Sequence, residues 1–202
     1  MTRFGLLFGP LATVLFVLGV AVLATMVPGY SHVHQTMSEI GEVGSPVQMP
    51  FTIMAVAVAV CILVFAIALR GASVAAGHSA LAAYVTGCMA ISLAGVGIFS
   101  FPHPLHNVFG ISEIVGYQAP LAFALTWRRD PRARSLVAFS WIMFVAVWIA
   151  IGLNLSSLDS SGSLWHTVHP VIGIAQRALF GAWFLWLAVT GLALFAKAPA
   201  RA

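Results

Sequence analysis

Charged residues are scarce in this sequence, at 7% of a chain of 202 residues. A soluble domain carries about 25% charged residues, so this chain lacks the side chains needed to cover a water-facing surface. Only two cysteines are present, Cys61 and Cys88, and both lie inside apolar runs, which argues against a disulfide framework or a thiolate metal site. The single lysine, Lys197, lies outside the apolar core of any run, which argues against a retinal Schiff base. H-E-x-x-H and G-x-S-x-G motifs are absent too, so two hydrolase signatures are missing.

Long apolar runs dominate the sequence instead, and 61% of its residues are hydrophobic. Runs near or above the roughly 20 residues that cross a bilayer recur along the chain. They predict an all-α integral membrane protein, a single six-helix membrane domain over residues 1–202, with helices at 4–27, 49–69, 79–99, 107–127, 135–153 and 165–195. The first run is longer than the about 7–15 residues of a signal-peptide core, so we expect a retained helix.

The basic residues predict the orientation of these helices. Arg3, Arg70, the arginines of the segment 128–134, Lys197 and Arg201 all fall on one side of a six-span arrangement, and only Arg177 departs from this pattern. By the positive-inside rule this side is cytoplasmic, and it holds both termini. The net charge of +4 therefore bears on orientation. We expect a multi-pass cell-membrane protein whose partner is the lipid bilayer and not nucleic acid.

Six of the seven histidines fall on the opposite, extracytoplasmic side, and only His78 is cytoplasmic. The six are His32, His34, His103, His106, His166 and His169. Since imidazole is a poor side chain for a lipid-facing surface, the sequence predicts a polar cluster at the outer end of the bundle.

Helical spacing predicts which polar residues face one another. His106 and Glu113 are seven positions apart, so they share one face of a helix. A second polar stripe, at 3-4-4 spacing with Gln176 beside it, is formed by His166, His169, Gly173 and Arg177. Glu113 and Arg177 come out at similar depths in the outer leaflet, so an ion pair between them is reasonable. The alternative is that Arg177 snorkels outward.

Three interpretations of the histidines stay open. His106, His166 and His169 are candidate ligands of zinc or another divalent metal, with His103 a weaker candidate and haem a less favoured cofactor. A metal-free polar pocket is the second interpretation, and Ser38, Glu39, Gln176 and Arg177 are its candidate residues. Structural hydrogen bonding is the third. If the protein is an enzyme, the catalytic candidates are His106, Glu113 and Arg177.

The first outer loop, "YSHVHQTMSEIGEVGSP", is predicted to fold as a cap over the bundle rather than to hang as a tether. Tyr30 in this loop is typical of an interfacial anchor. Ser31 or Ser38 could act as a nucleophile only if a base activates it.

The sequence resembles the bacterial and archaeal membrane family known as domain of unknown function 998. The likeness lies in "YSHVHQTMSEIGEVGSPVQMPF", "GIFSFPHPLHNVFG" and "GIAQRALFGAWFLWLAVTGLAL". It implies six helices and puts Ser38, Glu39, His106 and Arg177 on motif positions, but it implies no reaction. Many relatives resemble "FPTDP" where this chain has "FPHPLH", so His103 stands at or near an acidic position. The resemblance does not extend to "WHTVHP", which is not carried over as a family signature.

Together these observations favour a multi-pass membrane protein whose outer, histidine-rich pocket binds a metal, a lipid or another small ligand. The alternative is a metal-dependent, hydrolase-like membrane enzyme that acts on a lipid or lipid-linked substrate in the outer leaflet. A transporter is disfavoured because no ionisable path continues below Glu113. The sequence specifies neither the ligand nor the oligomeric state.

Overall fold

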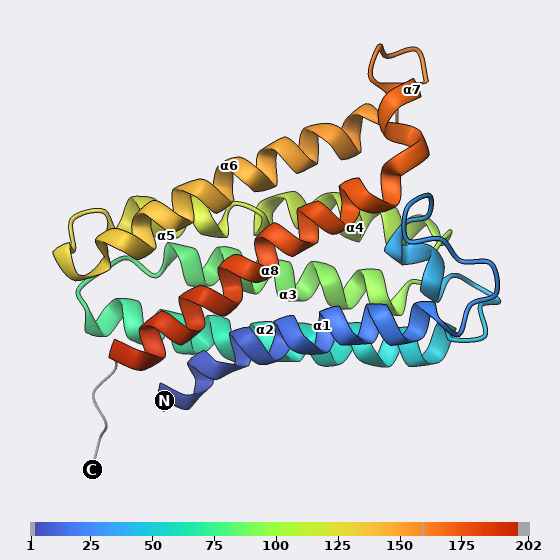
Figure 1. The fold of residues 1–202 in the computed structure, drawn as a ribbon. Helices are drawn as coiled ribbons and strands as arrows, with labels where there is room; N and C mark the ends of the chain where they lie inside the picture. Colours follow the sequence, from blue (N-terminus) through green and yellow to red (C-terminus); the bar gives the residue numbers. More distant parts are fainter. Residues whose placement is uncertain (1–2, 159, 198–202) are drawn as a thin grey trace.

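The computed structural model describes residues 3–158 and 160–197 and consists of helices that lie side by side along one direction (Figure 1). Six segments of this part of the chain are long and apolar enough to cross a membrane, as the sequence predicted. They are Arg3–Ala24, Gln48–Ala75, Leu81–Ile98, Pro104–Trp127, Pro131–Ser156 and Trp165–Lys197.

The second and third spans are single helices, α2 (Gln48–Ala75) and α3 (Leu81–Ile98). The first span consists of η1 (Arg3–Leu7) and α1 (Phe8–Ala24), the fourth of α4 (Pro104–Gly116) and α5 (Ala119–Trp127), and the fifth of η3 (Pro131–Ala133) and α6 (Arg134–Ser156). The sixth span consists of α7 (Trp165–Val168), η4 (His169–Val171) and α8 (Ile172–Lys197). A further 3-10 helix, η2 (Met37–Gly41), lies in the connection between α1 and α2.

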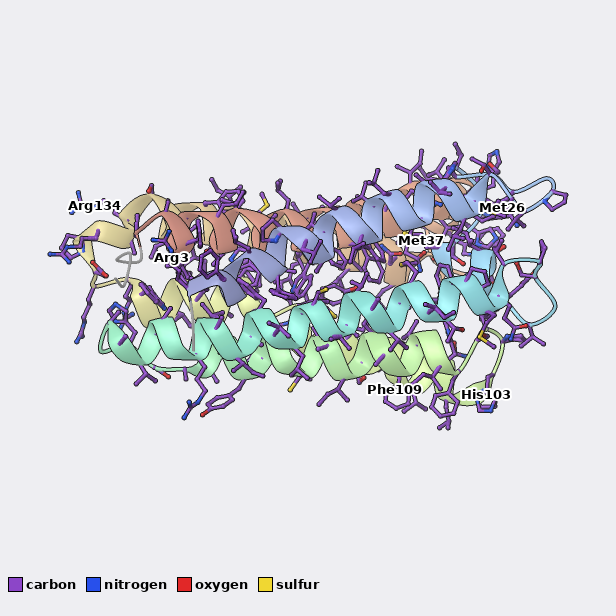
Figure 2. The ribbon with its side chains drawn as sticks, turned by 90° about the horizontal axis from the view of Figure 1, so that it is seen from below. Arg3, Met26, Met37, His103, Phe109 and Arg134 are labelled. Carbon is purple, nitrogen blue, oxygen red and sulfur yellow. The ribbon has the colours of Figure 1, made fainter. Side chains whose placement is uncertain are left out.

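The connections between the helices lie at the two ends of the bundle (Figure 1). The start of α1, the end of α8 and the turns α2–α3 and α5–α6 lie at one end. The α1–α2 connection, the α3–α4 turn and the α6–α7 connection lie at the other. We call residues 25–47 the cap loop and this second end the capped end. Figure 2 shows Met26, Met37 and His103 at the capped end, with Arg3 and Arg134 at the opposite end.

The core between the helices is aromatic. Trp183, Trp186 and Phe184 of α8 are at most 1% exposed, as are Phe65 of α2 and Phe123 of α5. Many other apolar side chains point outward, and Ile53, Ile91 and Ile142 are each more than 60% exposed. An apolar surface of this kind is costly in water and well solvated by lipid tails, as expected of a membrane domain.

The helix predicted at 107–127 is interrupted in the structure. It consists of α4 and α5, which are separated at Tyr117 and Gln118. Pro120 is the cause, because proline has no N–H to bond the carbonyl four residues before it and its ring clashes with that carbonyl. The carbonyl in question belongs to Gly116, and the indole Nε1 of Trp183 donates to it at 3.0 Å. The break thus supplies a contact between α4 and α8.

The helix predicted at 165–195 is interrupted as well. Pro170 lies in η4, which separates α7 from α8. The chain forms a 3-10 turn there, and the long helix begins at Ile172. The carbonyl of Pro170 accepts a hydrogen bond from Nδ1 of His34 at 2.6 Å. The cap loop is therefore attached to this bend.

Candidate functional site

Arg177 of α8 holds the cap loop onto the bundle. Its Nη1 donates to the carbonyl oxygens of His32 at 2.9 Å and Gln35 at 3.1 Å, and to the carbonyl of Gly173 at 2.9 Å. Its Nη2 donates to the hydroxyl oxygen of Tyr30 at 2.6 Å. The guanidinium thus binds several points of one loop, a task that suits its fork of donors.

Tyr30 completes this attachment. Its hydroxyl donates to the carbonyl of Thr36 at 2.8 Å while it accepts from Arg177. Burial raises the pKa of Tyr30 above its ordinary value of 10.0, against the opposing effect of the Arg177 hydrogen bond. The phenol therefore keeps the proton that it donates. From the sequence alone, Tyr30 is predicted only to be an interfacial anchor.

Gly173 allows the cap loop to lie directly on α8. Its N–H donates to the carbonyl of Val33 at 3.0 Å. A Cβ at this position would come within 2.8 Å of the carbonyl oxygens of His32, Val33 and Gln35. Only glycine leaves room for this approach, and the cap loop is therefore folded against the helix, as the sequence predicted.

The turn that follows is η2, and it is stabilised from both sides. The N–H and Oγ1 of Thr36 both donate to Oε1 of Glu39 at 2.8 Å, as part of a capping box. The N–H of Met37 donates to Oε1 of Gln176 at 2.6 Å. A capping box satisfies backbone donors at the start of a helix, so η2 presents its next residue, Ser38, in a defined orientation.

Ser38 contacts His106 of α4. The Oγ of Ser38 and Nε2 of His106 are 3.0 Å apart. The other ring nitrogen, Nδ1, is 2.8 Å from the carbonyl of Phe99 and 3.1 Å from the carbonyl of Val96. Since carbonyl oxygens only accept, Nδ1 carries a proton. In the neutral ring Nε2 then has the lone pair, and Ser38 donates to it.

Burial and position distinguish this serine–histidine pair from the other polar residues of the capped end. His106 is only 7% exposed. Ser38 lies on the wall of a small cavity of about 30 Å³ beneath the cap loop, and Gln176 is the other polar residue of that wall. A space of this size accommodates about one water molecule. Of the pair, Ser38 therefore borders a cavity between the cap loop and the helices, while His106 is buried behind it.

The predicted ion pair between Glu113 and Arg177 is not formed. Glu113 is 4% exposed, and its Oε2 accepts the hydroxyl of Tyr117 at 3.0 Å. Its Oε1 is buried without a hydrogen-bond partner. Arg177 is turned to the cap loop, whose carbonyls satisfy its charge without a carboxylate. Arg177 therefore reaches toward the capped end, the direction that snorkelling predicted, and there it binds the cap loop.

The two histidines of "WHTVHP" lie on the surface. His166 and His169 are both exposed, and the ring of Trp165 stacks on His169 with 4.6 Å between ring centroids. His103 is exposed as well, and its Nδ1 caps α4 by accepting from the N–H of Leu105 at 3.1 Å. These contacts are structural hydrogen bonding and ring packing, which was one of the three predicted roles.

In the described part of the chain, no three His, Cys, Asp or Glu side chains are grouped as a bound metal ion requires. The structure therefore does not assemble the candidate ligands His106, His166 and His169 into a metal site. Both ring nitrogens of His106 already have partners. The three histidines could bind one metal ion only if the capped end rearranged.

The sequence matches the family described as "Protein of unknown function (DUF998)" over residues 10–193. The chain belongs to the DUF998 family. No curated protein and no solved structure matches it. The matched range of this DUF998 chain contains the cap loop and all the candidate residues, including Ser38, His106 and Arg177.

The contact between Ser38 and His106 is the main feature that sequence reasoning missed. The two residues are 68 positions apart, and no spacing rule joins a loop serine to a helix histidine. The only signal was the resemblance, which puts both residues on motif positions. Periodicity instead directed attention to the histidines of the sixth helix.

Proposed function

We propose that this DUF998 protein is a membrane-embedded enzyme of acyl transfer, a hydrolase or transferase of lipid esters, with Ser38 as nucleophile and His106 as general base. The observation that carries the proposal is the 3.0 Å hydrogen bond between Ser38 Oγ and His106 Nε2. A serine hydroxyl is a weak nucleophile until an adjacent base accepts its proton. His106 is thus the base without which Ser38 could not act as a nucleophile.

The surroundings of His106 support the assignment of roles. The base of a serine nucleophile needs a third group that holds its tautomer and stabilises the imidazolium. The carbonyl of Phe99, 2.8 Å from Nδ1, is placed to do this. A carbonyl stabilises the imidazolium less than a carboxylate would, so we expect a slower enzyme than one with an Asp in this role.

The reaction follows from these roles. The Oγ of Ser38 attacks the ester carbonyl carbon while its proton passes to Nε2 of His106. The tetrahedral intermediate collapses, the alcohol leaves with that proton, and the acyl group stays on Ser38. Water, or a second alcohol, then attacks the acyl carbon and gives its proton to His106. His106 passes this proton to the departing Oγ of Ser38, so that a carboxylic acid or a new ester leaves and the serine hydroxyl is restored.

Gln176 is the proposed donor to the oxyanion. It lines the same cavity as Ser38, and its Oε1 is occupied by the N–H of Met37. The Nε2 group is then the part of its amide that can donate to charge that develops on the ester oxygen. Because the capped end lies opposite the termini, the positive-inside rule assigns the substrate to the outer leaflet.

The test is ester turnover by the purified protein in detergent micelles or nanodiscs. Replacing Ser38→Ala or His106→Gln should each lower kcat by about a thousandfold or more, since the members of such a pair act as a unit. Ser31→Ala is the matched control, because Ser31 is in the same loop but its Oγ bonds only backbone N–H groups of Val33 and His34. Equal loss in all three variants, or no turnover by the wild type, would contradict the proposal.

A ligand-binding protein without turnover is the second candidate. The observation that favours it is the small size of the cavity at Ser38, about 30 Å³, which holds no lipid headgroup unless the cap loop moves. Native mass spectrometry of gently extracted protein distinguishes the two. A lipid or other molecule retained in stoichiometric amount, with no ester cleavage, would favour the binding protein.

A further inference from the structure

An apolar groove on the membrane-facing surface lies beside the serine–histidine pair. It runs between α1 and α2 near the capped end, and its volume is about 570 Å³. Small-molecule sites commonly measure about 300–1,000 Å³. The wall contains no polar side chain, and its members are Leu15, Leu18, Gly19, Val22, Leu23, Pro50, Ile53, Met54 and Ala57.

Met54 connects this groove to the proposed active site. It lines the groove on one side and the small cavity of Ser38 on the other. It packs into a notch at Gly19, where a Cβ would lie 2.6 Å from Cγ of Met54. A methionine side chain is unbranched and adapts its shape readily. Met54 is therefore the residue that the lipid-facing groove and the cavity of Ser38 share.

We infer that this groove holds the acyl chain of the substrate, and that the substrate is a long-chain ester that enters sideways from the bilayer past Met54. The inference rests on the proposed function and names its substrate class. The occupant is an acyl chain because the groove lies within two membrane-spanning segments, Arg3–Ala24 and Gln48–Ala75. Lipid tails are the surrounding medium there, and the apolar wall offers no group to recognise anything else.

The geometry of the groove also sets the direction of the substrate's acyl chain. The wall on α1 extends from Leu15 to Leu23, which is roughly 12 Å along the helix at 1.5 Å per residue. Pro50 and Leu23 are at its outer end, next to the cap loop, and Met54 lies about midway along it, opposite Gly19. An ester group held at Met54 would lie next to the cavity of Ser38, while the acyl tail runs along the apolar wall toward the bilayer midplane.

The first test compares esters of two chain lengths, para-nitrophenyl palmitate and para-nitrophenyl acetate. Leu18→Trp fills the groove from its exposed wall, since Leu18 is 58% exposed. Ile142→Trp is the matched control, because Ile142 is 61% exposed on α6, away from the groove. We expect Leu18→Trp to lower kcat/KM for the palmitate by about tenfold or more through lost chain burial. The acetate should be unaffected, and so should both esters in the control. Equal effects on the two esters, or none, would overturn the inference.

The second test does not depend on catalysis. Phosphatidylcholine vesicles with a diazirine in the acyl chain are used for photocrosslinking, and the adducts are mapped by mass spectrometry. We expect adducts at the groove residues Leu18 and Met54 to exceed those at Ile142, in the wild type and equally in Ser38→Ala. Adducts no more frequent than at Ile142 would refute the groove while the enzyme proposal stands. Enrichment without any ester turnover would refute the enzyme proposal while the groove stands.

Discussion

Replacing Arg177→Met should release the cap loop from the bundle. The change removes the donors to the carbonyls of His32 and Gln35 and to the hydroxyl of Tyr30. It keeps most of the apolar length of the side chain. A hydrogen bond to a charged group contributes about 1.5–3 kcal/mol. One of the three is exposed to solvent, so water can replace part of it. We expect a loss of about 2–4 kcal/mol in the free energy of unfolding.

Hydrogen exchange measured by mass spectrometry in micelles is the assay, because it reports the cap loop separately from the helices. Amides of residues 25–47 should exchange faster in Arg177→Met, while those of α3 and α6 should change little. Arg177→Lys should recover only part of the protection, since an ammonium group cannot fork to several acceptors. If the methionine variant matches the wild type in exchange and in unfolding, Arg177 does not hold the cap loop and the reasoning fails.

Three further predictions concern the pairing, the metal and the topology. Glu113→Gln and Arg177→Met should have additive effects on stability, measured as a double-mutant cycle; a coupling energy above about 1 kcal/mol would show an interaction. A chelator should leave ester turnover unchanged, and elemental analysis should find no stoichiometric zinc; inactivation by the chelator with rescue by zinc would restore the metal hypothesis. In intact cells an impermeant thiol reagent should label a single cysteine at Ser45 and not one at Ser135, which is exposed at the opposite end, in a background without the native cysteines; the reverse pattern would invert the orientation.

The six spans could be predicted from the sequence because each apolar run is long enough to cross a bilayer, and a helix satisfies all of its backbone hydrogen bonds there. Most predicted and observed boundaries agree within a few residues, but α2 continues to Ala75 beyond its predicted end at residue 69, and proline divides two of the predicted helices. Pro120 divides α4 from α5, and Pro170 separates α7 from α8. Hydropathy does not detect such breaks, since proline and its neighbours are apolar enough to continue the run.

The partners of the polar residues were harder to predict. Periodicity placed Arg177 and Glu113 at similar depths but contains no information on where a loop folds. The backbone carbonyls of the cap loop, which take the place of the expected carboxylate at Arg177, have no sequence signature. The same limit applies to Ser38 and His106, whose contact depends on how η2 is seated against α8 and α4.

Covalent labelling of Ser38 tests the central claim most directly. The purified wild-type protein is treated with a long-chain fluorophosphonate, which forms a stable phosphonyl adduct only with a serine activated by a base, and intact mass and peptide mapping locate the adduct. The account predicts one adduct per chain, on Ser38, absent from Ser38→Ala and strongly reduced in His106→Gln, with Ser31→Ala labelled like the wild type. A protein that stays unlabelled while it is folded, or an adduct on another residue, would contradict the assignment of Ser38 as a nucleophile.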